Sequence, residues 1–225
     1  ASGADTANVI RTILAETRNM DSLVHGLQAK VHESQNEIAT LRESLEATRQ
    51  EAMTDGLTGL ANRRRFDERL AELVEKSRAD GSPLGLIVCD IDHFKKFNDL
   101  HGHQMGDLVL RLVGKTLKEG IKGRDVAARY GGEEFALLLP ETNIRGGQSL
   151  AESLRTTLAS RKLARKGSSE TLAAVTMSFG VTEHIIGEPI EKFVARADAH
   201  MYQAKHEGRN RVSSGLDTPR IGKAG

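Results

Sequence analysis

The sequence predicts an α/β chain, more closely an α+β sandwich of one sheet with flanking helices, behind a long N-terminal helix. Two observations predict it. Apolar residues recur every seven positions through the first 52 residues. From residue 62 to residue 206, apolar runs of strand length alternate with amphipathic stretches of helix length. Helices placed between strands in this way are typical of a sheet covered by packed helices.

Residues 1–53 are predicted to form a parallel, dimeric coiled-coil helix. With Ile10 at position a, ten of the thirteen a and d positions are apolar, and the segment has no proline. A strict seven-residue repeat keeps an apolar seam against a partner helix, and Val or Ile at a with Leu at d favours two parallel strands. The alternative is a single amphipathic helix lying on the domain. We favour the dimeric stalk because a helix of that length, roughly 80 Å, would outreach a small domain.

The second part, residues 54–212, is predicted to be one domain. Two glycines in Thr54–Leu60 break the heptads, and an amphipathic helix is expected from Asn62. Pro83–Cys89 reads as a buried strand that ends in Asp90-Ile91-Asp92. Gly131-Gly132 between two apolar runs predicts a two-residue hairpin turn with positive φ. Further elements are expected as helices near 107–118, 147–160 and 190–206, strands at 126–130, 135–139 and 172–182, and a flexible tail over 213–225.

Composition and charge exclude several classes of protein. The net charge of +1, divided into −4 over residues 1–55 and +5 over the remainder, gives no field that would attract a nucleic acid polymer. The single cysteine, Cys89, excludes a disulfide scaffold and fits a reducing compartment. No apolar stretch approaches the roughly 20 residues that span a bilayer. We expect a cytoplasmic segment without membrane contact, and, since it begins at Ala1 without Met, a piece of a longer protein.

Acidic residues gather at two places where strands begin or end. Asp90 and Asp92 stand at the carboxyl end of the buried strand, on one face by alternation. Glu133 and Glu134 follow the paired glycines directly. If these places adjoin, three or four carboxylates converge, and such a cluster favours Mg²⁺ or Mn²⁺ held against substrate phosphates. The alternative is that Asp92 is a helix cap and Glu134 a solvated surface acid.

Basic and amide side chains supply complementary chemistry. Lys95 follows the acidic strand end, and Lys205 and Arg209 close the last helix, where two cations can reach a triphosphate or merely offset the helix dipole. Asn98 and Asp107 bracket a glycine-rich loop, and an amide with a carboxylate can read the donors and acceptors of guanine. Three nearby histidines fit no standard zinc spacing and are taken as structural.

At residues 129–135, Arg-Tyr-Gly-Gly-Glu-Glu-Phe, the sequence resembles the diguanylate cyclases, the GGDEF domain family, in its GGEEF form. Further motifs match in the family's order and extend the resemblance over about residues 53–212: residues 55–64 (DGLTGLANRR), 90–95 (DIDHFK), 98–99 (ND), 106–107 (GD) and 197–210 (ADAHMYQAKHEGRN).

The resemblance implies a palm-like nucleotide-cyclase fold and condensation of two GTP into cyclic di-GMP across a homodimer. It implies two Mg²⁺ (or Mn²⁺) per active site. Position by position, it assigns the metals to Asp90, the Ile91 carbonyl and Glu133, with help from Glu134. It makes Glu133 the catalytic base and Lys95 the residue that stabilises the transition state. It assigns guanine to Asn98 and Asp107, and the substrate phosphates to Phe94, Lys95, Lys205 and Arg209. An upstream sensory domain acting through the stalk is a further expected partner.

One departure from the family pattern concerns product inhibition. Many members carry an inhibitory product site, Arg-x-x-Asp, before the hairpin; here its Asp is Asp125 but its Arg is Lys122. Lysine lacks the bidentate, stacking contact of arginine, so weakened product inhibition is predicted. Arg124 or Arg155 are possible substitutes. Two other functions stay open: a catalytically silent module that binds GTP or cyclic di-GMP, and a coiled-coil assembly protein.

Overall fold

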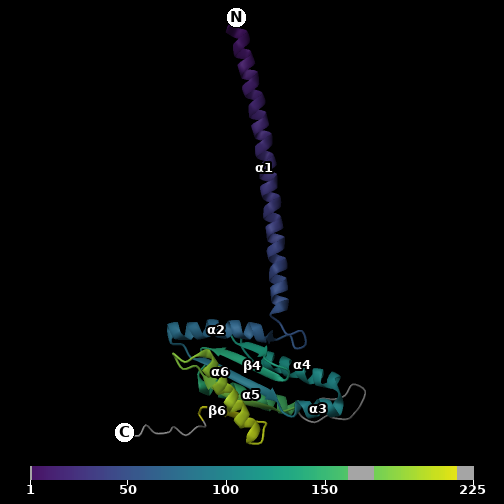
Figure 1. Ribbon diagram of the computed structural model, residues 1–225, viewed down its shortest axis with the longest axis vertical. Coiled ribbons are helices and arrows are strands. Elements are labelled where there is room, and N and C mark those ends of the chain that lie inside the picture. The colour runs from purple at the N-terminus through teal and green to yellow at the C-terminus, as the bar shows by residue number, and fades with distance from the viewer. Residues whose placement is uncertain (1, 162–174, 217–225) are drawn as a thin grey trace, which may run out of the picture. The chain divides into compact units, whose positions relative to one another are not determined.

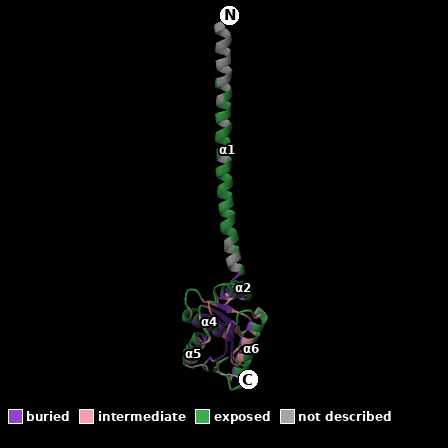
Figure 2. Ribbon diagram, turned by 90° about the vertical axis from the view of Figure 1, so that its left-hand side faces the viewer, coloured by how far each residue is buried: buried purple, intermediate pink, exposed green. Residues whose placement is uncertain are grey.

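The computed structural model describes residues 2–161 and 175–216 and divides the chain into two compact units, residues 1–52 and 53–225. The first unit is one helix, α1 (Ser2–Ala52) (Figure 1). Every apolar heptad residue whose side chain is described is exposed, from Val24 at 43% to Leu45 at 69% (Figure 2). Among the described residues, no helix combines the length and the apolar character that a membrane span requires.

The second unit holds a six-stranded mixed sheet in the order β1-β3-β4-β2-β5-β6. The central strand β2 pairs antiparallel with β4 and β5, while the edge strands β1 and β6 pair parallel with β3 and β5. The strands are β1 (Ala61–Asn62), β2 (Leu84–Ile91), β3 (Val126–Arg129), β4 (Glu134–Pro140), β5 (Met177–Glu183) and β6 (Val212–Ser214); the helices are α2 (Arg63–Asp80), α3 (Phe94–His101), α4 (His103–Gly120), α5 (Ile144–Ser160) and α6 (Ile190–His206).

Helices cover both faces of this sheet. The strand β2 sends alternate side chains to opposite faces, so it is buried along its whole length. Ile87, Cys89 and Ile91 pack with α3, α4 and α5. Leu86 and Val88 pack with α2 and α6. By the same alternation, Asp90 faces the side of α2 and α6. The predicted sandwich of one sheet with flanking helices is confirmed.

Gly180 on β5 sets how closely α6 approaches the sheet. A Cβ atom at this position would lie 2.1 Å from the Ala197 carbonyl oxygen and 2.2 Å from the Met201 backbone nitrogen. Real contacts of that length do not occur, so only glycine lets the helix backbone rest directly on the strand. This contact fixes α6, whose last turn carries Lys205, against the strand beside β2.

Several sequence predictions need correction. Residues 94–101, for which no helix is predicted, form α3, and α4 begins at His103 rather than near 107. Strand β6 takes residues 213 and 214 out of the predicted tail. The hairpin between β3 and β4 is wider than the two residues predicted: Arg129 pairs with Phe135, and neither glycine adopts a positive φ. Residues 172–174 of the predicted strand and 217–225 of the predicted tail lie outside the described residues.

Candidate active site

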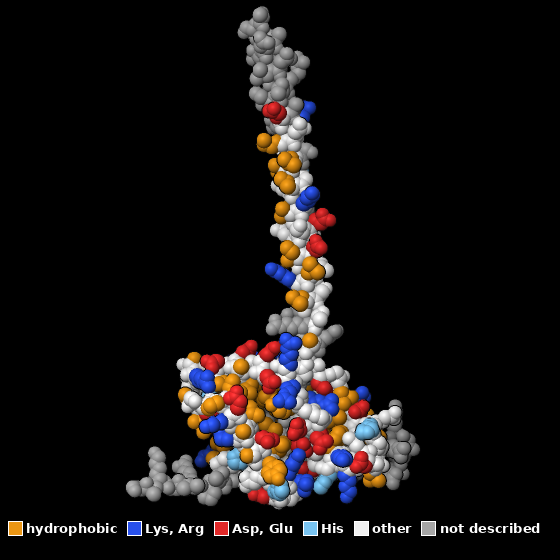
Figure 3. Space-filling view, viewed as in Figure 1, with side chains coloured by type: hydrophobic (Ala, Val, Ile, Leu, Met, Phe, Trp, Pro, Cys, Tyr) orange, Lys and Arg blue, Asp and Glu red, His pale blue; other side chains and the backbone are white. Residues whose placement is uncertain are grey.

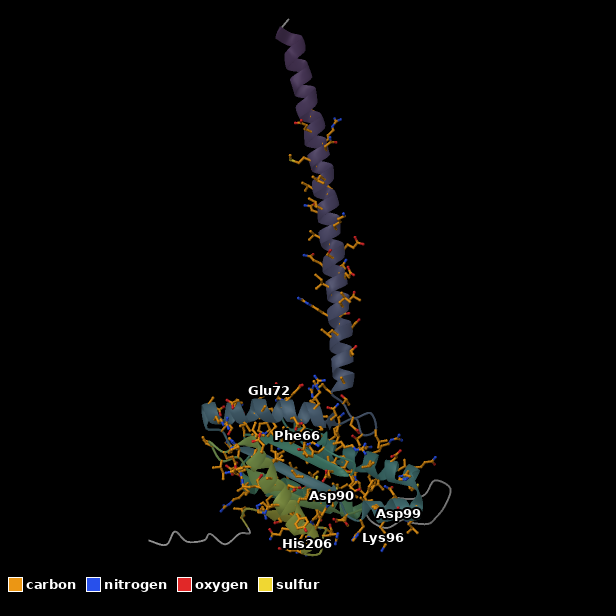
Figure 4. All side chains as sticks on the ribbon, in the orientation of Figure 1. Phe66, Glu72, Asp90, Lys96, Asp99 and His206 are labelled. Atoms are coloured by element: carbon orange, nitrogen blue, oxygen red, sulfur yellow. The ribbon has the colours of Figure 1, made fainter. Side chains whose placement is uncertain are left out.

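Asp90 is the buried centre of the candidate site. It is the residue before the last of β2, lies opposite Glu134 of β4 and Ser178 of β5, and has a side chain only 5% exposed. Lys205 Nζ lies 2.9 Å from Asp90 Oδ1 and forms an ion pair with it. Figure 4 places Asp90 between α3, with Lys96 and Asp99, and the end of α6 at His206.

The glycine hairpin brings two further carboxylates to this strand end. The Glu133 carbonyl accepts a hydrogen bond from the Ile91 amide at 3.3 Å, which fastens the loop to β2. A Cβ atom on Gly131 would lie 2.5 Å from Glu134 Oε2. The Glu134 carboxylate thus lies against Gly131 and would have to shift if residue 131 carried a side chain, while the backbone of Gly131 has no positive φ. In the space-filling view, acidic and basic side chains adjoin on this face of the domain (Figure 3).

Arg129 links the glycine hairpin to Asp55, a role that the sequence did not predict. Its guanidinium donates to the Gly132 carbonyl at 2.7 Å and lies 3.3 Å from an Asp55 carboxylate oxygen. Asp55 also accepts hydrogen bonds from the Thr58 amide and hydroxyl. Burial raises the pKa of Asp55, but the hydrogen bonds from Thr58 and the charge of Arg129 outweigh it, so the net pKa is lowered. Residues 55–58 and the hairpin are thereby tied through one arginine.

The three carboxylates are coupled electrostatically. Burial raises the pKa of Asp90, Lys205 lowers it, and the charges of Glu133 and Glu134 raise it again, to about 6 in all. Burial likewise raises the pKa of Glu133, against the lowering effect of Lys205 and with a further rise from Glu134. A strand end that holds acids with raised pKa values is under electrostatic strain that added positive charge would relieve.

This strain predicts that Asp90→Asn stabilises the ligand-free protein. The folded-state pKa of about 6 exceeds the unfolded value of 3.8, so ionised Asp90 destabilises the fold above about pH 6, and the penalty fades as pH falls towards 4. The variant should gain on the order of 2 kcal/mol at pH 7.5 and about a third of that at pH 4.5, by thermal unfolding with a chelator present. Asp99→Asn on α3 is the control and should change little at either pH. A less stable Asp90→Asn at pH 7.5 would contradict the expectation.

The donor set fits a hard divalent cation. Carboxylate oxygens suit Mg²⁺ and Mn²⁺, and Mg²⁺ is commonly held by one or two carboxylates together with substrate phosphates. Within residues 2–161 and 175–216, no three His, Cys, Asp or Glu side chains lie close enough to hold a metal as they stand. The side chains thus fit a cation shared by Asp90, Glu133 and a phosphate ligand better than a closed protein cage.

Asp92 does not join this group, contrary to the convergence predicted for it. Its carboxylate accepts hydrogen bonds from the Thr176 and Ser178 hydroxyls and from the Asn210 amide. It is not a helix cap either, because α3 has His93 at its N-cap.

Helices α3 and α4 place the residues predicted to bind phosphate and guanine. Phe94 is buried at the start of α3, and Lys95 beside it is exposed. Asn98 Oδ1 is buried and accepts no hydrogen bond from any described residue. A Cβ atom on Gly106 would lie 1.9 Å from this oxygen, so Gly106 preserves the space around the Asn98 amide. Asp107, the next residue on α4, is exposed.

The end of α6 carries the two other predicted phosphate ligands. Lys205 is partly buried beside Asp90, and Arg209 is exposed three residues beyond the helix end. Gly208, with φ of 115°, ends the helix in the manner expected of a C-terminal glycine. Arg209 and Asn210 follow with φ of 63° and 44°.

The predicted product site forms a separate turn at the opposite end of β3. Asp125 accepts a hydrogen bond from the Lys122 amide at 2.9 Å and so closes the turn, while the Lys122 side chain is exposed. Arg124 pairs with Glu141 at 2.8 Å. Arg155 on α5 pairs with Glu152 and donates to Asn210 Oδ1 at 3.1 Å. Both arginines considered as substitutes for Lys122 are thus engaged with other partners.

Comparison with known proteins decides the family. Residues 52–211 match the family model described as diguanylate cyclase, GGDEF domain. The chain belongs to the GGDEF domain family. Its glycine hairpin carries the motif as Gly-Gly-Glu-Glu-Phe, and the acids and glycines described above lie inside the matched range.

Several relatives of this GGDEF chain are named as cyclases. The chain is 36% identical over 208 residues to the diguanylate cyclase VdcA of Vibrio cholerae, covering 92% of this chain and 60% of VdcA. It is 40% identical over 189 residues to the diguanylate cyclase DgcP of Pseudomonas aeruginosa, covering 84% of this chain and 28% of DgcP. The chain thus spans less than two thirds of these relatives.

A solved structure resembles both parts of the chain. It is the coiled coil and GGDEF domain of DgcB from Caulobacter crescentus in complex with c-di-GMP, at 41% identity and a TM-score of 0.78. The match covers 84% of this chain and 98% of the DgcB chain.

Proposed function

We propose that this chain is a diguanylate cyclase that condenses two GTP molecules into cyclic di-GMP and releases two pyrophosphates. The observation that carries the proposal is buried Asp90, coupled to Glu133 and Glu134 and balanced by Lys205. Relatives named as cyclases support it. The Asn98 side chain on α3 adds to the proposal, because its buried oxygen has no hydrogen-bond donor among the described residues and suits the N–H donors of a guanine edge. A site that bound only a metal would not need such an acceptor.

In the proposed mechanism, one GTP lies on each of two domains, and the 3′-hydroxyl of each attacks the α-phosphate of the other. Glu133 takes the proton from the attacking hydroxyl, a role suited to a carboxylate whose pKa burial has raised. Lys95 offsets the charge that develops on the phosphate, and Lys205 and Arg209 hold the terminal phosphates. Two divalent cations at Asp90, the Ile91 carbonyl and Glu133, with Glu134 assisting, would polarise the phosphate and lower the pKa of the hydroxyl.

Each domain has half of the reacting pair, so the proposal requires a homodimer. Heptad residues exposed on α1 in the single chain give it a seam for a second copy. Joining two domains through a stalk raises the effective concentration of one half-site at the other to the millimolar range. We further propose that an upstream sensory domain acts through the register or crossing of this stalk, in the cytoplasm.

The direct test is incubation of the chain with GTP and Mg²⁺, followed by chromatography for a cyclic dinucleotide and pyrophosphate. One cyclic dinucleotide and two pyrophosphates for every two GTP consumed support the proposal. GTP that binds but stays unchanged would assign the chain to the silent signalling modules. A chain that neither binds nor converts guanine nucleotides would be an assembly protein, and the proposed function would be wrong.

Product inhibition is proposed to be weak, and Lys122→Arg is expected to strengthen it. A guanidinium at this exposed turn can make the bidentate contact with a phosphate or guanine that an ammonium cannot. We expect the concentration of cyclic di-GMP that halves the rate to fall by about tenfold or more, which corresponds to one added charged hydrogen bond. Lys118→Arg, at an exposed position on α4, is the control. Equal inhibition of wild type and Lys122→Arg in progress curves would refute the expectation.

A further inference from the structure

Asp92 lies two residues after Asp90 yet contacts a different part of the molecule. Its Oδ2 accepts hydrogen bonds from the Thr176 hydroxyl at 2.8 Å and the Asn210 amide at 3.0 Å. Its Oδ1 accepts one from the Ser178 hydroxyl at 2.7 Å. Three donors compensate the charge of this carboxylate, so Asp92 is occupied as an acceptor, whereas Asp90 has the Lys205 ammonium as its partner.

The Asn210 contact supports a turn in an uncommon backbone conformation. Arg209 and Asn210 have φ of 63° and 44°, in the left-handed region that arginine rarely adopts and asparagine tolerates better. Two such residues in succession need contacts from outside to hold them. The Arg209 amide donates a hydrogen bond to the Ala204 carbonyl, and the Arg155 guanidinium donates one to the Asn210 side-chain oxygen. Asp92 accepts one from the Asn210 amide. Of these three contacts, only the last links the turn to the end of β2.

We propose that Asp92 is a positioning residue for the terminal phosphates of the nucleotide. It acts through Arg209, because it fixes the backbone of the next residue and so the direction in which the arginine leaves the turn. Together with the Asp90–Lys205 ion pair, it ties the end of α6 to the end of β2 at two points. The inference rests on the proposed function, in which Arg209 holds those phosphates.

A purely structural role, in which Asp92 only anchors the segment around β5, makes a different prediction. The variant Asp92→Ala removes all three hydrogen bonds. The matched control, Thr176→Val with Ser178→Ala, removes the two hydroxyl contacts and leaves the Asn210 contact in place. If Asp92 acts through the turn, only the first variant disturbs phosphate binding; if it anchors β5, both variants behave alike.

The experiment compares the binding of GMP with that of an α,β-methylene analogue of GTP, which cannot react at the α-phosphate. Asp92→Ala should weaken the analogue by about tenfold while GMP binding stays within twofold, and the control should match the wild type. Adding Asp92→Ala to Arg209→Ala should cause no further loss, since residues that act as one unit are non-additive. Equal losses for both nucleotides, or additive losses, would overturn the inference.

Two outcomes separate this inference from the proposed function. If the wild-type chain binds no guanine nucleotide, the proposed function fails and the inference with it. If the wild type binds the analogue and Arg209→Ala weakens it while Asp92→Ala does not, only the inference fails. Should Asp92→Ala not fold, Asp92→Asn serves instead: its neutral amide oxygen accepts a weaker hydrogen bond from the Asn210 amide than a carboxylate does, so the same selective loss is expected at smaller size, and unselective loss would overturn the inference.

Discussion

Glu133→Gln is expected to abolish cyclase turnover, by about a thousandfold or more, and to leave the fold and GTP binding in place. The amide keeps the shape of the carboxylate but cannot accept the proton of the attacking hydroxyl or hold a cation. A general base alone contributes about 10²- to 10⁴-fold, and loss of a metal ligand adds to it. Because the charge of Glu133 raises the pKa of Asp90, removing it relieves repulsion, so the variant should be at least as stable as the wild type. The rate of cyclic dinucleotide formation at saturating GTP and Mg²⁺ measures the effect.

Two comparisons show whether the loss belongs to Glu133 itself. Glu134→Gln changes the adjacent carboxylate, which is assigned a helping role, and should cost less than Glu133→Gln. Glu119→Gln removes an acid from the exposed surface of α4, where it pairs with Lys115 and Arg161, and should leave the rate unchanged. A Glu133→Gln protein that unfolds at the wild-type temperature, binds GTP and still turns over at a tenth of the wild-type rate would remove Glu133 from the catalytic base position.

The site divides its two strand-end aspartates between separate tasks. Asp90 is buried beside Glu133 and Glu134 with Lys205 as its ionic partner, which makes its charge unfavourable and suited to a cation, while Asp92 accepts three hydrogen bonds and holds a turn. Lys205 compensates the first until a ligand arrives. The charge of Asp90 lowers the stability of the fold, as is typical of functional sites, where a group is kept in an unfavourable state because its chemistry requires it.

Sequence patterns predicted those parts of the site that depend on local structure. The apolar run of β2 placed Asp90 at a buried strand end, and the order of the motifs placed Glu133 on the adjoining hairpin. The long-range contacts could not be predicted: Asp92 accepts hydrogen bonds from Ser178 and Asn210, which are 86 and 118 residues away in the sequence. No local pattern predicts such pairs, because they depend on how distant elements pack.

Two local errors have the same origin. Paired glycines usually mark a turn with positive φ, but neither Gly131 nor Gly132 adopts one, and the Glu134 carboxylate lies against Gly131 instead. Strand β1 has only two residues and β6 only three, so each exists through its pairing with β3 or β5 rather than through its own sequence. In both cases tertiary contacts decide what the local sequence leaves open.

Charging the stalk seam is expected to reduce cyclase activity by about a hundredfold or more at nanomolar chain concentration. Val31→Asp with Ile38→Asp places two acids at successive a positions, which lie 55% and 49% exposed in the single chain and would be buried in a dimer. Burial of unpaired charges in such a seam is strongly unfavourable, so the stalk should separate. Each half-site then meets its partner only by diffusion, and the millimolar effective concentration is lost. Light scattering and the cyclase rate are measured on the same samples.

The matched control adds the same two charges away from the seam, through Asn36→Asp and Ala39→Asp, both exposed on α1. This variant should stay dimeric and retain its rate, which separates the effect of the seam from that of charge. Because the seam variant keeps its domains intact, raising its concentration should restore activity in proportion to the dimer formed. A monomeric seam variant with the full wild-type rate at nanomolar concentration would show that one domain suffices, and the requirement for two half-sites would be wrong.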